Sequence, residues 1–313
     1  MSDGEDALPP AFQRRNHYPE LAWFSDATRA GDWPAIAAGF QRLDSWAAAS
    51  VASSRVGDVP GAEVFLRQVV AREPSALSAT LLGSALISAG WRIRTSKAAE
   101  HVSREQFEAL HEHLREAEQA LMGVTARDPR AVMAWEDRLT TAMGLQLGLA
   151  EARRRYDRLA RIEPHHYIAQ SALTQQLCPK WGGSWEALFQ FVRERAAAAP
   201  PGGLHGALVA TAHLEYWARA DGEEADASLK RAQPEVWAAA QRSVLHPSFR
   251  PEPGWIAAFN TFAAFFAFGG AADPAAVFFR GLGPHASTTW WDYLGDGVEM
   301  FHAYRTGALG GPR

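Results

Sequence analysis

The chain has 313 residues, of which 31 are basic and 35 acidic, so its formal net charge is −4. This balance gives no electrostatic reason to expect nucleic acid or an acidic membrane surface as a partner. Hydrophobic residues make up 47% of the chain and charged residues 21%, which excludes general disorder and is ordinary for a protein that folds around a core.

The cysteine content and the apolar segments favour a cytoplasmic protein. The single cysteine, Cys178, excludes an internal disulfide framework and a cysteine-based zinc site, and it suits a reducing compartment. Residues 1–10 are acidic and lack the cationic start and apolar run of a secretory signal. The most hydrophobic stretch, residues 255–268, is shorter than the roughly 20 residues that span a membrane. We therefore expect a buried helix there and no membrane partner.

The first part of the chain is expected to contain a flexible N-terminus, residues 1–17, followed by a helix pair within residues 19–55. The sequence Gly31-Asp32-Trp33-Pro34 marks the turn between the two helices. Asp32 can cap the second helix, and Pro34 suits its first turn because a proline there loses no hydrogen bond.

Helical periodicity is clearest from Phe107 onward. Apolar residues recur there every three or four positions, at Phe107, Leu110, Leu114, Ala117 and Leu121. This period predicts a helix with one buried face. The charged residues outside the stripe are expected to stay in water; they are Glu105, Glu108, Glu112, Arg115 and Glu118. No run of alternating β-branched and aromatic residues predicts a strand, so we expect an all-α fold.

One pattern of spaced residues occurs three times. In each copy a small, a large and a medium-sized apolar residue precede an acidic residue and a proline, and another alanine follows. The three sets are Ala62, Leu66, Val69, Glu73-Pro74 and Ala79; Ala117, Leu121, Val124, Asp128-Pro129 and Ala134; and Ala152, Tyr156, Leu159, Glu163-Pro164 and Ala169. We expect the small residues to let helices approach closely and each proline to separate one helix from the next.

This order of residues resembles the tetratricopeptide repeat family, in which each repeat is a pair of helices. Pro129 and Pro164 lie 35 positions apart, close to a repeat period of about 34 residues. Pro74 and Pro129 lie 55 positions apart, which indicates an insertion, placed at residues 91–103. The resemblance covers about residues 61–220, with the best repeats at 61–200, and implies an irregular α-solenoid. The sequence departs from the family in the insertion and in lacking the consensus Trp, Leu and Gly of each first helix.

A wider resemblance, over about residues 60–295, is to a group of bacterial helical-repeat proteins of unknown function. The residues that carry it are Trp181-Gly182-Gly183-Ser184, Phe189, Phe191, His213-Leu214-Glu215, Asn260-Thr261-Phe262-Ala263 and Trp290. It implies no activity. The segment from Trp181 to Ser184 is interpreted as a structural corner in which Ser184 caps a helix, or as an amide nest for an anion.

The last quarter of the chain is rich in aromatic residues. Residues 234–305 are therefore expected to form a cap that covers the apolar face of the last repeat. A cavity for an apolar ligand or a peptide side chain would have the same composition. The segments expected here are a connector at 247–253, a loop at 281–289, a final helix at 297–305 and a flexible tail at 306–313. Residues 18–305 are expected to form one domain.

Short catalytic motifs are absent from the sequence, including phosphate-binding loops, nucleophile elbows and paired-histidine zinc helices. A Glu followed three residues later by His occurs at Glu108/His111, Glu163/His166 and Glu299/His302. Di-iron carboxylate bundles use this spacing. We interpret these pairs as solvated or helix-capping side chains and expect neither a metal nor a cofactor. Cys178 is interpreted as buried filler, and Arg153 to Arg155 as a solvated helix face.

Two functions are compatible with this sequence. The first is an interaction scaffold that binds a protein or peptide on the concave face of the helical array, a hypothesis that rests on fold analogy. The alternative is an enzyme or small-ligand-binding protein whose aromatic-lined pocket lies between the repeats and the C-terminal helices. The residues expected to line such a groove or pocket are His205, His213, Tyr216, Trp217, Asn260, Trp290, Trp291 and His302.

Overall fold

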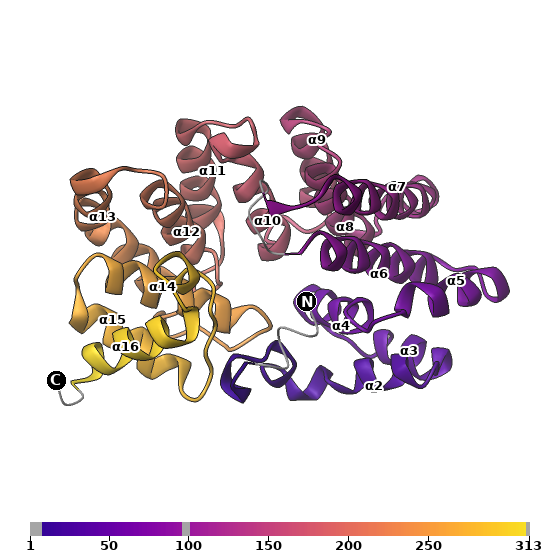
Figure 1. Ribbon diagram of the computed structural model, residues 1–313, viewed down its shortest axis with the longest axis horizontal. Coiled ribbons are helices and arrows are strands. Elements are labelled where there is room, and N and C mark those ends of the chain that lie inside the picture. Colours follow the sequence, from indigo (N-terminus) through magenta and orange to yellow (C-terminus); the bar gives the residue numbers. More distant parts are fainter. Residues whose placement is uncertain (1–7, 96–100, 311–313) are drawn as a thin grey trace. The chain divides into compact units, whose positions relative to one another are not determined.

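A computed structural model describes residues 8–95 and 101–310 of the protein (Figure 1). All regular structure in these two ranges is helical, and they contain no strand, which confirms the predicted all-α fold. The chain divides into two compact units. Unit 1 contains the described residues from 18 to 176, and unit 2 contains residues 8–17 together with those from 177 onward. That residues 18–305 form one domain stays a prediction.

Unit 1 begins with three short helices where the sequence predicted a pair. After the 3-10 turn η3 (Pro19–Leu21) come α2 (Trp23–Arg29), α3 (Trp33–Phe40) and α4 (Trp46–Gly57). Asp32 caps α3 as predicted, because its carboxylate accepts a hydrogen bond from the Ala35 amide at 3.0 Å. A second cap, Ser45, accepts from the Ala48 amide at 3.1 Å and starts α4 as a separate helix.

The three aligned repeats correspond to consecutive helices. These are α5 (Ala62–Arg72), α6 (Ala76–Arg94), α7 (Arg104–Arg127), α8 (Val132–Gly144), α9 (Leu149–Ala160) and α10 (Tyr167–Leu177). The six alanines of the pattern are all buried, with exposed fractions between 0 and 9%. Each acidic residue and proline lies between two helices, as predicted. The predicted insertion at 91–103 includes the end of α6, and its residues 96–100 lie outside the described part of the chain.

Helices α4, α6 and α8 pack against one another in unit 1, and α5, α7 and α9 pack against them in turn (Figure 1). Two glycines allow the closest approaches. A Cβ atom at Gly57 of α4 would lie 3.1 Å from the backbone oxygen of Ser84 in α6. A Cβ atom at Gly83 of α6 would lie 2.7 Å from the side chain of Leu121 in α7. Helix α6 is therefore held tightly between α4 and α7.

Helix α6 is also the one helix, within residues 8–95 and 101–310, that is long and apolar enough to cross a membrane. However, 67% of that apolar stretch is buried inside the protein, and α4, α5, α7 and α8 all contact it. This burial is the property of a core helix in a globular protein.

Unit 2 has an aromatic core. Its helices are α11 (Trp185–Ala198), α12 (Gly206–Trp217), α13 (Gly222–Arg242), α14 (Trp255–Phe268), α15 (Ala272–Leu282) and α16 (Gly297–Leu309), with 3-10 turns η5 (Pro179–Trp181) and η6 (Trp291–Tyr293). Seven of its aromatic side chains are almost completely buried; they are Phe262, Phe265, Phe266, Phe278, Phe279, Trp291 and Phe301. The concentration of aromatic residues near the C-terminus therefore supplies the interior of unit 2.

The described parts of the two segments predicted to be flexible contain helical structure. Residues 8–17, here called the N-terminal strap, contain the 3-10 turns η1 (Pro10–Phe12) and η2 (Arg14–Asn16). Phe12 is 3% exposed and its ring centroid lies 5.2 Å from that of Phe301, because an apolar ring is stabilised by leaving water. At the other end, α16 continues to Leu309. The remaining parts of the two predicted flexible ends, residues 1–7 and 311–313, lie outside the described part of the chain.

Candidate functional site

A polar cavity of about 160 Å³ lies in unit 1 between α4, α6 and α8. Most of its lining consists of hydroxyl and carboxyl side chains. The lining residues are Ser50, Ser53 and Ser54 of α4; Ser84, Ile87 and Ser88 of α6; and Met133, Glu136, Asp137 and Thr140 of α8. None of these ten side chains is basic, so the cavity carries acidic character. We call it the serine–carboxyl pocket.

Helical spacing and close packing bring these hydroxyl groups together. Ser53 and Ser54 follow Ser50 by three and four positions, so the three serines share one face of α4. Ser84 and Ser88 are four positions apart on α6 and share one face in the same way. Because Gly57 lets the two helices approach closely, the hydroxyl of Ser53 reaches that of Ser84 and donates to it at 2.8 Å.

Each carboxyl group of the pocket is bound to a serine from a neighbouring helix. Ser50 donates to Oε2 of Glu136 at 2.5 Å, which links α4 to α8. Ser84 donates to the carboxyl group of Asp137, which links α6 to α8. The two carboxyls thus lie at the junction of three helices.

Burial makes ionisation of both carboxyl groups unfavourable. The Glu136 side chain is only 16% exposed. Burial, followed by repulsion from the neighbouring Asp137 charge, raises the pKa of Glu136 to about 8. Burial also raises the pKa of Asp137 to about 7. Near neutral pH the pocket therefore retains exchangeable protons that ordinary carboxyl groups would have lost.

His166 faces one of these carboxyl groups. Its side chain is 2% exposed, and its Nε2 lies 3.2 Å from Oε2 of Glu136. The Nδ1 atom accepts a hydrogen bond from the Ala169 amide at 3.3 Å, so in the neutral ring Nε2 carries the hydrogen. That Nε2 makes no hydrogen bond within the described residues. Burial lowers the pKa of His166 to about 4, which keeps the ring neutral at physiological pH.

His166 therefore caps the start of α10, in agreement with one of the roles predicted for the Glu163/His166 pair. Its acidic neighbour in space is Glu136 instead of Glu163. Within residues 8–95 and 101–310, no group of three or more His, Cys, Asp or Glu side chains is arranged to hold a metal ion.

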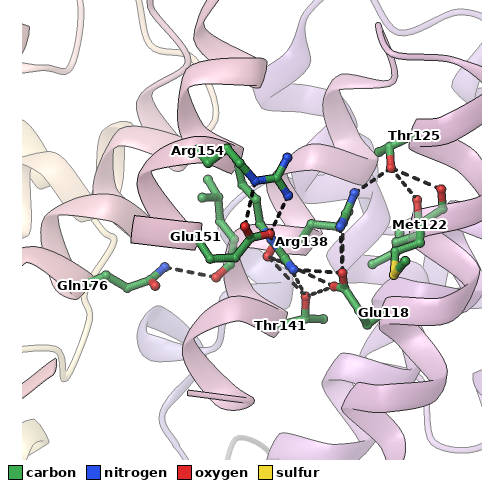
Figure 2. Close-up of polar contacts among 11 residues, drawn as sticks. Glu118, Met122, Thr125, Arg138, Thr141, Glu151, Arg154 and Gln176 are labelled. Carbon is green, nitrogen blue, oxygen red and sulfur yellow. Dashed lines mark hydrogen bonds and ion pairs between the residues drawn. The ribbon is translucent and has the colours of Figure 1, made fainter. Parts of the chain in front are cut away.

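A second polar cluster joins α7, α8 and α9 and is fully paired (Figure 2). Glu118 accepts hydrogen bonds on Oε1 from Arg138 at 2.8 Å and from Arg155 at 2.9 Å. Its Oε2 accepts from Thr141 at 2.5 Å and from Arg155 at 2.9 Å. Both oxygens of this carboxylate are occupied, so the cluster acts as a clamp between helices and offers no acceptor to a ligand.

This clamp corrects two predictions from the sequence. Glu118 was expected in water, yet it is buried because two guanidinium groups compensate its charge. Arg155 was expected on a solvated face, yet it is 2% exposed, while Arg154 is exposed as predicted. Hydrogen bonds from Arg154 and Arg155 oppose protonation of Glu151, and the hydrogen bond from Arg154 contributes most to lowering the pKa of Glu151 to about 2.

The eight residues predicted to line a groove all belong to unit 2, and none of them lines the serine–carboxyl pocket. His213 is the most interesting of them chemically, since its Nε2 lies 3.0 Å from Oε2 of Glu235. Arg193 donates to both oxygens of the same carboxylate, at 2.6 and 3.1 Å. Burial lowers the pKa of His213, and the hydrogen bond to Glu235 opposes that effect.

Three of the predicted groove residues hold a loop in the core of unit 2. Asn260 is 1% exposed, accepts a hydrogen bond from the indole of Trp291 at 2.9 Å and donates to the backbone oxygen of Thr289 at 3.0 Å. The indole of Trp290 donates to Thr261 at 3.3 Å. These side chains therefore fix residues 289–291 against α14.

The other four predicted groove residues are distributed over unit 2. His205 is buried immediately before α12, and Tyr216 packs edge-on against Trp185. Trp217 packs against Phe268, and the exposed His302 lies against Phe12. That these residues line one groove stays a prediction.

The segment before α11 has the predicted corner geometry. Gly182 adopts a φ of 86°, in the left-handed region that favours glycine, and Ser184 caps α11 by accepting from the Ala187 amide at 3.2 Å. Cys178, just before this corner, is buried, and burial raises its pKa to about 12. Such a thiol is inert as a nucleophile, as expected for buried filler.

The serine–carboxyl pocket was not among the predicted sites, although the sequence contains a signal for it. Serines at three- and four-residue spacing are unusual choices inside alanine-rich helices, because serine favours caps and turns. Glu136 and Asp137 stand together in the middle of an otherwise largely apolar helix. Only the packing of α4, α6 and α8 shows that these residues meet.

A scan against protein-family models finds no family that matches this chain, and a search of curated proteins finds no relative.

Proposed function

We propose that the protein is a partner-binding helical-repeat protein and that α4, α6 and α8 form the face that contacts a protein or peptide. The serine–carboxyl pocket is the observation that carries this proposal. Burying a carboxyl group without a compensating cation is unfavourable, and Glu136 and Asp137 both have raised pKa values for that reason. Groups with such perturbed pKa values in a cavity are typical of functional sites.

The repeat alignment supports the choice of this face. In the alignment, α5, α7 and α9 precede the prolines, and α6, α8 and α10 follow them. We call the helices that follow the prolines first helices. Helix α4 is counted with them because it immediately precedes α5, as α6 precedes α7. First helices that pack side by side create the extended surface that helical-repeat proteins use for binding. All three helices that line the pocket are first helices in this sense.

The chemistry of the pocket favours recognition of a small group. It offers hydroxyl and carboxyl oxygens in a cavity of about 160 Å³, with two apolar side chains among the lining residues. A few precisely placed polar groups in a concave site are what fix the orientation of a bound group. We propose that a side chain or terminus of the partner enters the pocket while the surrounding helices contact the rest of the partner, and that this takes place in the cytoplasm.

The test is selection of peptides from a random display library on the full-length protein, followed by binding to two variants. Ser54→Phe places a ring at the pocket wall, and we expect it to weaken the selected peptides by about tenfold or more. Val64→Phe adds the same ring on α5, at a position 53% exposed, and should leave affinity unchanged. Equal affinity for both variants would refute the proposal, as would hydrogen-exchange protection confined to unit 2.

A further inference from the structure

We infer that the group bound in the serine–carboxyl pocket is a cationic nitrogen on an aliphatic stem, of the alkylammonium class. This inference rests on the proposed function, because it names the chemistry of the group that the pocket receives. A lysine side chain of a peptide and a free alkylamine share this chemistry.

Two sets of buried carboxyl groups in unit 1 differ in their charged partners. Glu118 is compensated by the guanidinium groups of Arg138 and Arg155. Glu136 and Asp137 have no such partner: within residues 8–95 and 101–310, neither forms an ion pair with Lys or Arg. The cation that would balance these two carboxyl groups is therefore missing from the described part of the protein.

His166 does not supply that cation. It is 4% exposed, and its ring lies against Glu136 with Nε2 lacking a hydrogen-bond partner among the described residues. A protonated imidazole would pair with the carboxylate, but burial opposes that protonation. His166 thus leaves Glu136 without a cationic partner. The hydrogen bonds to the two carboxyl groups come from Ser50 and Ser84 within the described residues, and a carboxylate can accept more than one.

Hydrogen-bond acceptors dominate the lining of the pocket. Ionised carboxylates only accept hydrogen bonds, and each serine or threonine hydroxyl accepts as well as donates. An ammonium group carries three donors and no acceptor. It therefore complements oxygens that approach from three helices. A cation in the pocket would also favour loss of the protons that Glu136 and Asp137 retain, whereas an anion would oppose it.

The size of the cavity also suits an alkylammonium group. The cavity of about 160 Å³ is comparable to the cavities of about 150 Å³ that hold benzene in other proteins, so it has room for about six heavy atoms. Butylammonium contains five heavy atoms, and the lysine side chain contains five beyond its Cα atom. Ile87 and Met133 supply apolar wall against which the methylene groups can pack.

The experiment is an amide chemical-shift titration of the full-length protein with n-butylamine, which is a cation at neutral pH, and with n-butanol, which has the same shape without charge. Sodium chloride at equal concentration controls for ionic strength. We expect saturable shifts of α4, α6 and α8 amides with n-butylamine only. In the Glu136→Gln/Asp137→Asn double variant the amine should bind about tenfold more weakly or not at all. The Glu112→Gln variant removes an exposed acidic group on α7 and should behave like the unmodified protein.

A lysine dipeptide with blocked ends identifies the source of the group. Its binding at the same amides shows that a peptide side chain is accepted, and binding of n-butylamine alone shows a free amine; both outcomes support the inference. Equal binding of n-butanol would overturn it, because charge would not matter. The inference would also be overturned if n-butylamine did not bind while Ser54→Phe still weakened the display-selected peptides. That result would leave the proposed function intact.

Discussion

Two kinds of buried carboxyl group occur within unit 1, and their surroundings give them opposite effects on stability. Glu118 accepts hydrogen bonds from two arginines and a threonine, so its burial is compensated. Glu136 and Asp137 are bound by serines, which stabilise a negative charge less than a guanidinium group does. The pocket therefore lowers the stability of the folded protein near neutral pH, which is a common property of sites retained for binding.

We predict that replacing these two carboxyl groups stabilises the protein at mildly alkaline pH. Glu136 and Asp137 titrate at about 8 and 7 in the folded protein, against 4.5 and 3.8 ordinarily. Between the ordinary and the raised values the folded state holds more protons than the unfolded state, so this contribution to stability falls as pH rises. Glu136→Gln/Asp137→Asn should remove that fall and increase the unfolding free energy above pH 8 by about 1–3 kcal/mol.

Urea denaturation across the pH range checks this prediction. The titration of His166 determines the pH range in which the unfolding free energies should be compared. Its pKa of about 4 lies below the ordinary 6.5, so its own contribution to stability increases with pH over that interval. The difference between the double variant and the unmodified protein should therefore be read from pH 6.5 upward, where the two carboxyl groups act without His166. A difference that stays constant from there to pH 9 would contradict the raised pKa values.

At the scale of helices, the Glu118 cluster joins three elements that are otherwise held by apolar contacts. Arg155 of α9 reaches Glu118 of α7 and also donates to the backbone oxygen of Arg138 in α8 at 2.6 Å. Its Nε donates to Glu151 at 2.7 Å within its own helix. Removing one partner of such a buried set leaves the others uncompensated, which costs far more than the set contributes when complete.

We predict that Arg155→Ala destabilises unit 1 by about 3 kcal/mol, because Glu118 would remain buried with only part of its compensation. Arg154→Ala is the matched control. Arg154 is the preceding residue, its side chain is 52% exposed, and its hydrogen bonds within the described residues go to Glu151. Its effect should stay below about 0.5 kcal/mol. Urea unfolding followed by circular dichroism measures both, and equal effects would show that the cluster does not clamp the helices.

Much of the helical arrangement could be predicted from periodicity and prolines, because these are local signals. The stripe from Phe107 to Leu121 corresponds to α7, and the aligned alanines are buried. Two features required information about packing. Glu118 looked solvated because a charged residue beside an apolar stripe normally is, and the serines of α4 and α6 gave no sign of which helix they face. A pocket formed by three helices is a property of their contacts.

At the scale of the whole molecule, two segments that lie far apart in the sequence meet in unit 2. The Ala286 amide donates to the backbone oxygen of Ala11 at 3.0 Å, and Phe12 packs on Phe301. Unit 2 is therefore built from two separate segments of the chain, with unit 1 inserted between them. The apolar residues of this short segment are Leu8, Ala11 and Phe12. They are too few to show a helical period, so the sequence pattern did not predict this arrangement.

We predict that Phe12→Ala destabilises unit 2 selectively, by about 3 kcal/mol, because it removes a buried ring next to Phe301. Hydrogen exchange should accelerate at amides of α15 and α16, while amides of α6 in unit 1 keep their protection. Arg14→Ala, in an exposed part of the same strap, should change neither unit. Equal acceleration in α6 would indicate that the two units unfold together.

The N-terminal strap also imposes an order on biosynthesis. Phe12 is translated 289 residues before Phe301, and Ala11 is translated 275 residues before Ala286. At about 5–20 residues per second, the strap waits roughly 15–60 s for its binding surface. During that interval unit 1 can complete its folding while Phe12 stays without its partner ring, so the nascent chain exposes this apolar side chain until α16 has been made.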